Sequence, residues 1–198
     1  MKRDSRGAYF LELAMSFFVM SLVGWLWEVG IHLLGGGGFV NRGMLHGPWL
    51  PIYGLGSVMI LALPHGLQKK PLLEFLVIVV LCGCMEYFAS WLLEQLYDGR
   101  KWWDYSDYFL NLNGRICVEG LLAFGLGGMA MVYIFAPFLD RVFRCIPRRG
   151  MIAVCAVLVA LFCIDLACSV REPNTGRGVT AVSEYCGSTK GKEEAKAC

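Results

Sequence analysis

The chain has 198 residues, of which 57% are hydrophobic and 17% are charged, and its formal net charge is +2. A soluble domain carries about 25% charged residues, so this composition excludes an ordinary soluble fold and indicates a protein surrounded by the lipid bilayer. The small net charge also argues against a nucleic-acid partner.

Five apolar segments are long enough, or nearly long enough, to cross a bilayer, since a spanning helix needs about 20 mostly apolar residues. They cover residues 9–34, 50–67, 72–97, 112–139 and 151–170, and the second is short and contains Gly and Pro. The sequence therefore predicts an all-α integral membrane protein with about five transmembrane helices. We expect residues 1–170 to form a single helical bundle and the polar residues 171–198 to form a tail that cannot fold alone.

Basic residues in the short connecting segments predict the orientation, because Lys and Arg gather on the cytoplasmic side of a membrane. Nine share the side of the N-terminus: Lys2, Arg3, Arg6, Lys69, Lys70, Arg141, Arg144, Arg148 and Arg149. Four lie on the other side: Arg42, Arg100, Lys101 and Arg115. We therefore expect a multi-pass protein of the inner or plasma membrane with a cytoplasmic N-terminus. The first helix should be retained, since no small-residue cleavage pattern follows it.

The first outer loop is unusually apolar. Four glycines at positions 35–38 lead into residues 39–56, where Gly and Pro alternate with aromatic residues. A free loop in water would carry more polar side chains than this segment does. The pattern therefore predicts a re-entrant outer loop that dips into the membrane and is covered by protein.

The second outer loop is rich in aromatic residues. Trp102, Trp103 and Tyr105 are typical of an aromatic belt at the membrane surface. Asp104, which stands between two of them, would cap a short turn or gate a cavity. Asn113 is the expected N-cap of the fourth helix.

Several ionisable residues fall at membrane depth, where each costs several kcal/mol and marks a functional site by default. Glu28 lies near the outer end of the first helix, and Glu86 lies about 15 residues into the third, roughly 22 Å from its inner end. Arg115 and Glu119 stand four residues apart at the outer start of the fourth helix, and Asp165 lies late in the fifth. All five fall in the outer half of the membrane, which predicts one shared polar cavity.

The charges of this predicted cavity do not balance, because four carboxylates face only Arg42 and Arg115. Either some carboxylates are protonated through desolvation, or the cavity accepts a proton or a cation. Structural alternatives stay open: Arg115 and Glu119 as a helix-end ion pair, Asp165 as a helix-interface residue, and His46 as a plain polar loop residue.

The nine cysteines are better explained by packing than by chemistry. Five lie inside the apolar segments: Cys82, Cys84, Cys155, Cys163 and Cys168. Buried cysteine behaves as a small hydrophobic residue. Because the sequence has no CxxC pair and no cysteine–histidine spacing typical of zinc, we expect no metal and no cofactor.

Four blocks of the sequence resemble the family described as putative ABC-transporter type IV membrane proteins. They are residues 21–28; 39–43 with 47–48 and 51–54; 85–87 with 91–94; and 102–106 with 111–115. The resemblance spans about residues 16–139. Its recurrent polar positions correspond here to Glu28, Asn41, Arg42, Tyr53, Glu86, Trp103, Asp104, Asn113 and Arg115. With Glu119, which the depth argument adds, these are the candidate residues of a substrate-binding or polar cavity.

The resemblance implies a membrane transport component. The sequence has no GxxxxGK[ST] phosphate loop, so an ATP-driven permease would need a separate ATPase subunit as partner. About five helices is small for half of a permease, so we also expect a homodimer.

Two other hypotheses belong to different classes. In an intramembrane enzyme acting at the outer leaflet, Glu86 or Glu28 would be a general base, and Arg115 with Arg42 would hold an anionic lipid headgroup or a phosphate. No Ser/His, Cys/His or metal-ligand pattern supports that chemistry in the sequence. In an accessory or scaffolding subunit, the same charges would only join helices. We therefore favour a permease-like transport component.

Overall fold

The computed structural model describes residues 6–36 and 38–175, and most of these residues are helical. Four helices are long and apolar enough to cross a membrane. They are α1 (Arg6–Leu34), α3 (Pro71–Leu96), the continuous helix Val118–Cys145 and α6 (Arg148–Arg171). The third of these is formed by α4 (Val118–Ala130), a π-helical turn η2 (Met131–Phe135) and α5 (Ala136–Cys145). The predicted tail beyond residue 175 lies outside the described residues.

The second predicted span is only partly helical. Helix α2 (Pro51–Leu61) has 11 residues, a length of about 16 Å, which is too short to cross a bilayer alone. A 3₁₀ turn, η1 (His65–Lys69), follows it. Four helices of the described chain therefore meet the length criterion, and the predicted count of five is not confirmed.

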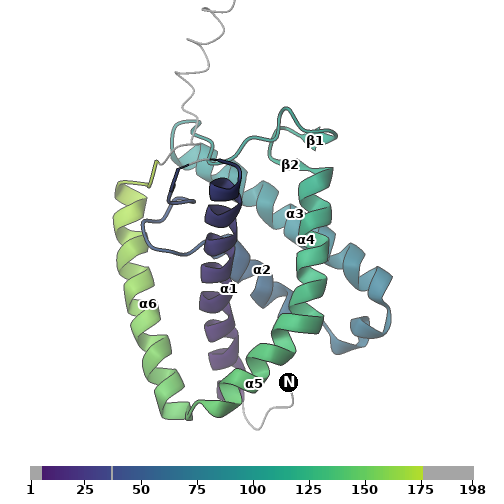
Figure 1. Ribbon diagram of the computed structural model, residues 1–198, viewed down its shortest axis with the longest axis vertical. Coiled ribbons are helices and arrows are strands. Elements are labelled where there is room, and N and C mark those ends of the chain that lie inside the picture. The colour runs from purple at the N-terminus through teal and green to yellow at the C-terminus, as the bar shows by residue number, and fades with distance from the viewer. Residues whose placement is uncertain (1–5, 37, 176–198) are drawn as a thin grey trace, which may run out of the picture.

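The loop before α2 packs along the side of α1. The backbone N–H of Leu50 donates a hydrogen bond of 3.0 Å to the carbonyl of Ser21, which lies near the middle of α1. Figure 1 shows residues 38–50 descending beside α1 from its outer end before α2 begins. The loop is thus packed along α1, while its re-entrant position in a membrane stays a prediction.

Glycines allow α2 to lie close against α1. A Cβ on Gly24 would come within 2.5 Å of Cδ2 of Tyr53, so the tyrosine ring fits only because this position has no side chain. In the same way, a Cβ on Gly54 would lie 2.6 Å from the carbonyl oxygen of Phe17. This close packing fixes where the Tyr53 side chain stands beside the outer half of α1.

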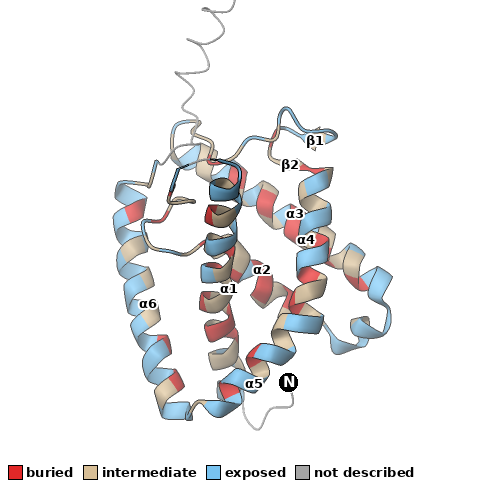
Figure 2. Ribbon diagram, viewed as in Figure 1, coloured by how far each residue is buried: buried red, intermediate tan, exposed pale blue. Residues whose placement is uncertain are grey.

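The apolar core occupies the half of the bundle that contains the N-terminal end of α1, which the sequence predicts to be the inner half. Its buried members are Met15, Ile60, Ile78, Cys82, Met131, Leu139, Phe143, Met151 and Cys155. Figure 2 shows the buried positions on the inward faces of α1, α3 and α4, whereas α6 is exposed along most of its length. In a protein that spans a membrane, these exposed apolar faces are the ones available to lipid. The opposite half also buries apolar side chains, among them Val29, Leu45 and Trp102, and it holds the polar side chains described below.

A short hairpin precedes α4 and corrects one prediction. Strands β1 (Asn111–Leu112) and β2 (Ile116–Cys117) pair antiparallel, with Asn113 and Gly114 in the turn at φ of 56° and 67°. Three residues, 113–115, connect the strands, and the N–H of Arg115 donates to the carbonyl of Leu112 at 3.0 Å, so Asn113 and Gly114 are the two central residues of a β-turn. Asn-Gly is the preferred dipeptide where both central positions need positive φ. Asn113 is therefore a turn residue and not the N-cap; Cys117 takes that role, with its Sγ accepting a hydrogen bond from the N–H of Gly120 at 3.4 Å.

Candidate functional site

Polar side chains from α1, α2, α3 and the two predicted outer loops lie in the half of the bundle away from the N-terminal end of α1, which the sequence predicts to be the outer half. We call this set the outer polar cluster: Glu28, Arg42, Tyr53, Glu86, Glu94, Tyr105 and Arg115. It contains five of the ten residues that the sequence selected as candidates. Its contacts divide into three groups, one around each glutamate.

The first group is centred on Glu28 of α1. Its Oε1 accepts a hydrogen bond of 2.7 Å from the Tyr53 hydroxyl, and its Oε2 lies 3.5 Å from the guanidinium of Arg42. The side chains of Glu28 and Arg42 are 33% and 28% exposed. This ion pair therefore forms the accessible rim of the cluster.

The second group is centred on Glu86 of α3, whose exposure is only 3%. The Tyr105 hydroxyl donates to its Oε1 at 3.1 Å. Its Oε2 is buried and has no hydrogen-bond partner among the described residues. Glu86 therefore lies inside the bundle. Half of its carboxyl group is nevertheless left without a donor, which is a costly arrangement for an ionised carboxylate.

Tyr105 is held as a hydrogen-bond donor by its surroundings. Burial raises the pKa of this phenol above its ordinary value, and the negative charges of Glu86 and Glu28 raise it further. Its hydroxyl therefore keeps its proton over the physiological range. Because the charges of Glu86 and Glu28 both act on the pKa of Tyr105, the first and second groups lie close to each other.

The third group is an ion pair between Arg115 and Glu94, whose side chains are 14% and 22% exposed. The Arg115 guanidinium also lies 5.3 Å from the ring centre of Tyr87, and its Nε has no partner in the described chain. The predicted alternative, a pair with Glu119, is not formed, and Glu119 is exposed. The reason is that Arg115 belongs to the hairpin and not to a helix, so a spacing of four residues does not bring the two side chains together.

The charge balance of the outer polar cluster differs from the prediction. Glu28 pairs with Arg42 and Glu94 pairs with Arg115, which leaves Glu86 as the one carboxylate of the cluster without a cation among the described residues. The uncompensated charge is therefore one and not two. It is located at the least exposed carboxyl group of the cluster.

The second outer loop positions Tyr105. Trp102 is buried, and the Trp103 indole N–H donates to the carbonyl of Arg115 at 3.1 Å. Asp104 accepts hydrogen bonds from the hydroxyl and the N–H of Ser106, at 2.5 and 3.0 Å. Burial alone would raise the pKa of Asp104, but these hydrogen bonds and the nearby Lys101 ammonium hold it below its usual value. Asp104 thus caps a turn, one of the two roles expected for it.

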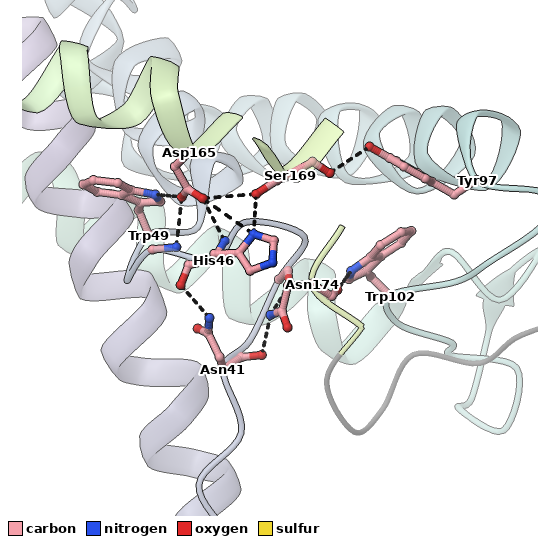
Figure 3. A network of polar contacts seen from close by, with 10 residues as sticks. Asn41, His46, Trp49, Tyr97, Trp102, Asp165, Ser169 and Asn174 are labelled. Atoms are coloured by element: carbon pink, nitrogen blue, oxygen red, sulfur yellow. Dashed lines mark hydrogen bonds and ion pairs between the residues drawn. The ribbon is translucent and has the colours of Figure 1, made fainter. Parts of the chain in front are cut away.

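Asp165 of α6 is hydrogen-bonded to the first outer loop (Figure 3). Its carboxylate accepts from the N–H groups of His46 and Gly47, at 3.1 and 2.9 Å, and from the Trp49 indole at 2.6 Å. The hydroxyl of Ser169 donates to the same carboxylate at 3.1 Å. The prediction that Asp165 shares a cavity with the other carboxylates is therefore not supported by its contacts. They match the interface alternative.

The meeting of Asp165, His46 and Ser169 is not a hydrolytic triad. Nδ1 of His46 lies 2.8 Å from the Ser169 hydroxyl and 3.8 Å from the Asp165 carboxylate. A triad needs its serine and its acid on different ring nitrogens of the histidine. Here both are on the same nitrogen, so the three side chains hold the loop on α6.

The same network holds Asn41, the residue next to Arg42. Its Oδ1 accepts from the Trp25 indole at 2.7 Å, and its Nδ2 donates to the carbonyl of His46 at 2.8 Å. Asn174, just beyond α6, donates to the carbonyl of Asn41 at 2.9 Å. Asn41 therefore positions the loop that carries Arg42 and does not touch the outer polar cluster itself.

Several partners in these contacts were not among the candidate residues, Glu94, Tyr105 and Asn174 among them. Tyr105 was interpreted only as part of an aromatic belt, and Asn174 as part of a polar tail. Asn113, by contrast, was selected as a candidate residue. Its Nδ2 donates to the hydroxyl of Tyr87 at 2.8 Å, and Tyr87 is not a member of the outer polar cluster. Within residues 6–36 and 38–175, no three His, Cys, Asp or Glu side chains are arranged to hold a metal ion.

The four long apolar helices and the buried ionisable groups define a multi-pass membrane protein. The model of the family described as "Putative ABC-transporter type IV" matches residues 15–170. The chain therefore belongs to this family, as the sequence blocks predicted. No curated protein and no solved structure matches the chain.

Proposed function

We propose that the chain is a permease-like transport component and that its outer polar cluster binds and releases a proton during transport. The proposal is supported by one observation above the others. Oε2 of Glu86 is buried and has no donor among the described residues, while both guanidinium groups of the cluster are bound to other carboxylates.

A proton is a better ligand for the unbonded Oε2 of Glu86 than a metal cation is. Binding a proton neutralises the carboxylate without any further ligand and removes the cost of a buried charge. A hard cation such as Ca²⁺ needs six or more oxygen ligands, and even Mg²⁺ needs about six. In the described chain the hydroxyl that hydrogen-bonds Glu86 is that of Tyr105, and the Glu28 carboxylate is already engaged by Arg42.

The path to Glu86 leads through the two outer loops. Arg42 lies on the first loop and Tyr105 on the second, and Glu28 with Arg42 is the exposed part of the cluster. Since Glu86 itself is 3% exposed, a proton reaches it only when one of these loops moves. We infer that the conformation described here is closed and that it opens toward the outer side.

Orientation and partners complete the proposal. Arg6 begins α1, Lys69 and Lys70 directly precede α3, and α5 and α6 meet at the same end of the bundle, opposite the cluster (Figure 1). Near that junction α5 carries Arg141 and Arg144, and α6 begins with Arg148 and Arg149. The positive-inside rule supports a cytoplasmic position for this end, and our proposal therefore has the cluster in the outer half of a plasma membrane. A separate ATPase would bind the cytoplasmic end, and a second copy of the chain would complete the permease.

The contacts favour transport over the enzyme hypothesis. An enzyme for an anionic lipid headgroup or a phosphate needs free guanidinium groups to hold the anion. Arg42 and Arg115 are instead neutralised by Glu28 and Glu94. The scaffold hypothesis accounts for these two ion pairs but not for Glu86.

The proposal is tested by proton flux into liposomes that contain a trapped pH-sensitive dye and are energised by a potassium gradient with valinomycin. Wild type should acidify the lumen faster than protein-free liposomes, and Glu86→Gln should not. Asp107→Asn is the matched control, because Asp107 is an exposed carboxylate of the second outer loop. Rates are compared per folded molecule, with thermal unfolding in detergent as the measure of folding. A Glu86→Gln rate equal to wild type, or a wild-type rate equal to protein-free liposomes, would contradict the proposal.

A further inference from the structure

The segment just beyond α6 contacts both predicted outer loops, the first (residues 38–50) and the second (residues 98–110). Figure 3 shows Asn174, which follows the end of α6 by three residues, between Asn41 of the first loop and Trp102 of the second. Each loop supplies one residue of the outer polar cluster, Arg42 and Tyr105 respectively. The contacts of Asn174 therefore bear on how the cluster is covered.

Asn174 donates to three carbonyl groups of the first outer loop. Its Nδ2 donates to the carbonyls of Asn41 and Gly43, at 2.9 and 3.0 Å, and its backbone N–H donates to that of Met44 at 2.9 Å. A side-chain amide has two N–H donors, and here both are used on the loop. Arg42 lies between the bound carbonyls, so Asn174 fixes the part of the loop that carries this residue.

The backbone carbonyl of Asn174 binds the second outer loop. It accepts a hydrogen bond of 3.1 Å from the Trp102 indole N–H. Trp102 is 7% exposed, and its ring lies edge-on to that of Tyr97, with 5.2 Å between the ring centres. The Tyr97 hydroxyl lies 3.4 Å from the carbonyls of Ser169 and Val170, in the last turn of α6. The start of the second loop is thus held against the end of α6.

The two loops are joined to each other through this segment. Among the residues that the structure describes, no hydrogen bond or ion pair runs directly from one loop to the other. The first loop is bonded to Asp165 and Asn174, and the second is bonded to Asn174. A movement that separates Asn174 from the first loop therefore also displaces the acceptor of the Trp102 indole.

We propose that Asn174 is a positioning residue of the outer polar cluster, which joins the two outer loops so that they open together and expose Glu86. Release of one loop removes a support of the other, so Arg42 and Tyr105 leave the cluster in one event. The joining of the loops does not depend on what the cluster binds. Only the statement that their opening admits a proton rests on the proposed function.

The test is hydrogen exchange of the full chain in lipid nanodiscs, read by mass spectrometry at single amides. The reporters are the N–H of Gly47, bonded to Asp165, and the N–H of Tyr105, bonded to the carbonyl of Gly114. Asn174→Asp removes both side-chain donors with little change of shape. It should accelerate exchange roughly tenfold at both reporters, since loss of two ordinary hydrogen bonds changes an equilibrium by about that factor. Acceleration at Gly47 alone, or at neither reporter, overturns the proposal.

Asn111→Asp is the matched control. Nδ2 of Asn111 also donates to two loop carbonyls, those of Ser106 and Tyr108, at 3.1 and 3.0 Å. Both acceptors belong to the second loop, so this change should leave the exchange rate of Gly47 at the wild-type value. An equal acceleration at Gly47 would mean that the loops are joined by a route other than Asn174, and the proposal would fail.

A second variant approaches the same contact from the other loop. If Asn174→Asp also accelerates exchange at Ile78 in the core, its global stability is reduced, and Trp102→Phe takes its place. This change keeps an aromatic ring beside Tyr97 and removes the indole N–H. Exchange at Gly47 should then rise, although no hydrogen bond joins Trp102 to the first loop. An unchanged rate at Gly47 contradicts the joining of the loops.

Chemical labelling connects the loops to Glu86. A water-soluble carbodiimide with an added amine modifies carboxyl groups that water reaches, and mass spectrometry locates the modified residue. Asn174→Asp should label Glu86 faster than wild type does, per folded molecule; an equal rate would overturn the role of Asn174 at the cluster. Neither exchange nor labelling requires proton transport. A wild-type protein without flux in the liposome assay would therefore refute the proposed function and leave the joining of the loops in place.

Discussion

Arg115→Ala should destabilise the protein whether or not Arg115 takes part in transport. The substitution leaves Glu94 mostly buried without its cation, and breaking a buried ion pair in this way costs about 3–5 kcal/mol. Both side chains retain some exposure, 14% and 22%, so we expect the lower end, about 3 kcal/mol. Loss of the contact with the Tyr87 ring adds about 0.5–1 kcal/mol. For a chain of this size, 3 kcal/mol corresponds to a fall in Tm of about 6–12 °C.

The assay is thermal unfolding in detergent, applied to a double-mutant cycle of Arg115→Ala, Glu94→Ala and the double variant. The double variant removes both charges, so it should be more stable than the sum of the two single changes predicts, with an interaction energy of about 2–3 kcal/mol. A Tm of Arg115→Ala within about 2 °C of wild type would refute the reasoning. It would mean that Glu94 does not depend on Arg115 for compensation of its charge.

Two further predictions concern orientation and pH. A thiol reagent that cannot cross membranes should label Ser106→Cys in intact cells and should not label Lys69→Cys, in a background without reactive native cysteines; the opposite pattern would place the outer polar cluster on the cytoplasmic side. Asp104→Asn should lower stability at neutral pH. Because the pKa of Asp104 is lowered below its ordinary 3.8, its contribution is present above that value and is lost as the pH falls through the lower folded-state pKa. The Tm difference between wild type and Asp104→Asn should therefore disappear in strong acid, and a difference that persists there would exclude this cause.

Much of the helical framework is predictable because an apolar segment of about 20 residues is nearly always a membrane-spanning helix. The segments predicted at 9–34, 72–97 and 151–170 correspond to α1, α3 and α6 within a few residues. The segment at 50–67 was predicted too long, since hydropathy does not distinguish a helix from an apolar loop or a 3₁₀ turn. The signals for the correct boundary are local: Pro51 can begin a helix, and Pro64 follows its end.

The sequence predicted which residues belong to the candidate site better than it predicted which of them contact each other. The predicted membrane depth of Glu86 follows from its position in a regular helix, whereas its burial against other parts of the chain is a finding of the structure. The partner of Arg115 does not follow from sequence spacing, because the Asn113–Gly114 turn places Arg115 on a hairpin beside Glu94. The Asn-Gly dipeptide was available as a signal. The contact between Glu86 and Tyr105 depends on how a loop folds back over α3, which no local pattern specifies.

The central claim is that Glu86 has no cation of its own. An experimental structure of the full chain in a lipid bilayer, at a resolution that places side chains, tests this most directly. We expect Arg42 on Glu28, Arg115 on Glu94, and Glu86 bound by Tyr105, with no guanidinium within about 4 Å of its carboxylate. A guanidinium from Arg42 or Arg115 bound to Glu86 would contradict the proposal, because Glu86 would then be one half of a structural ion pair with no need of a proton.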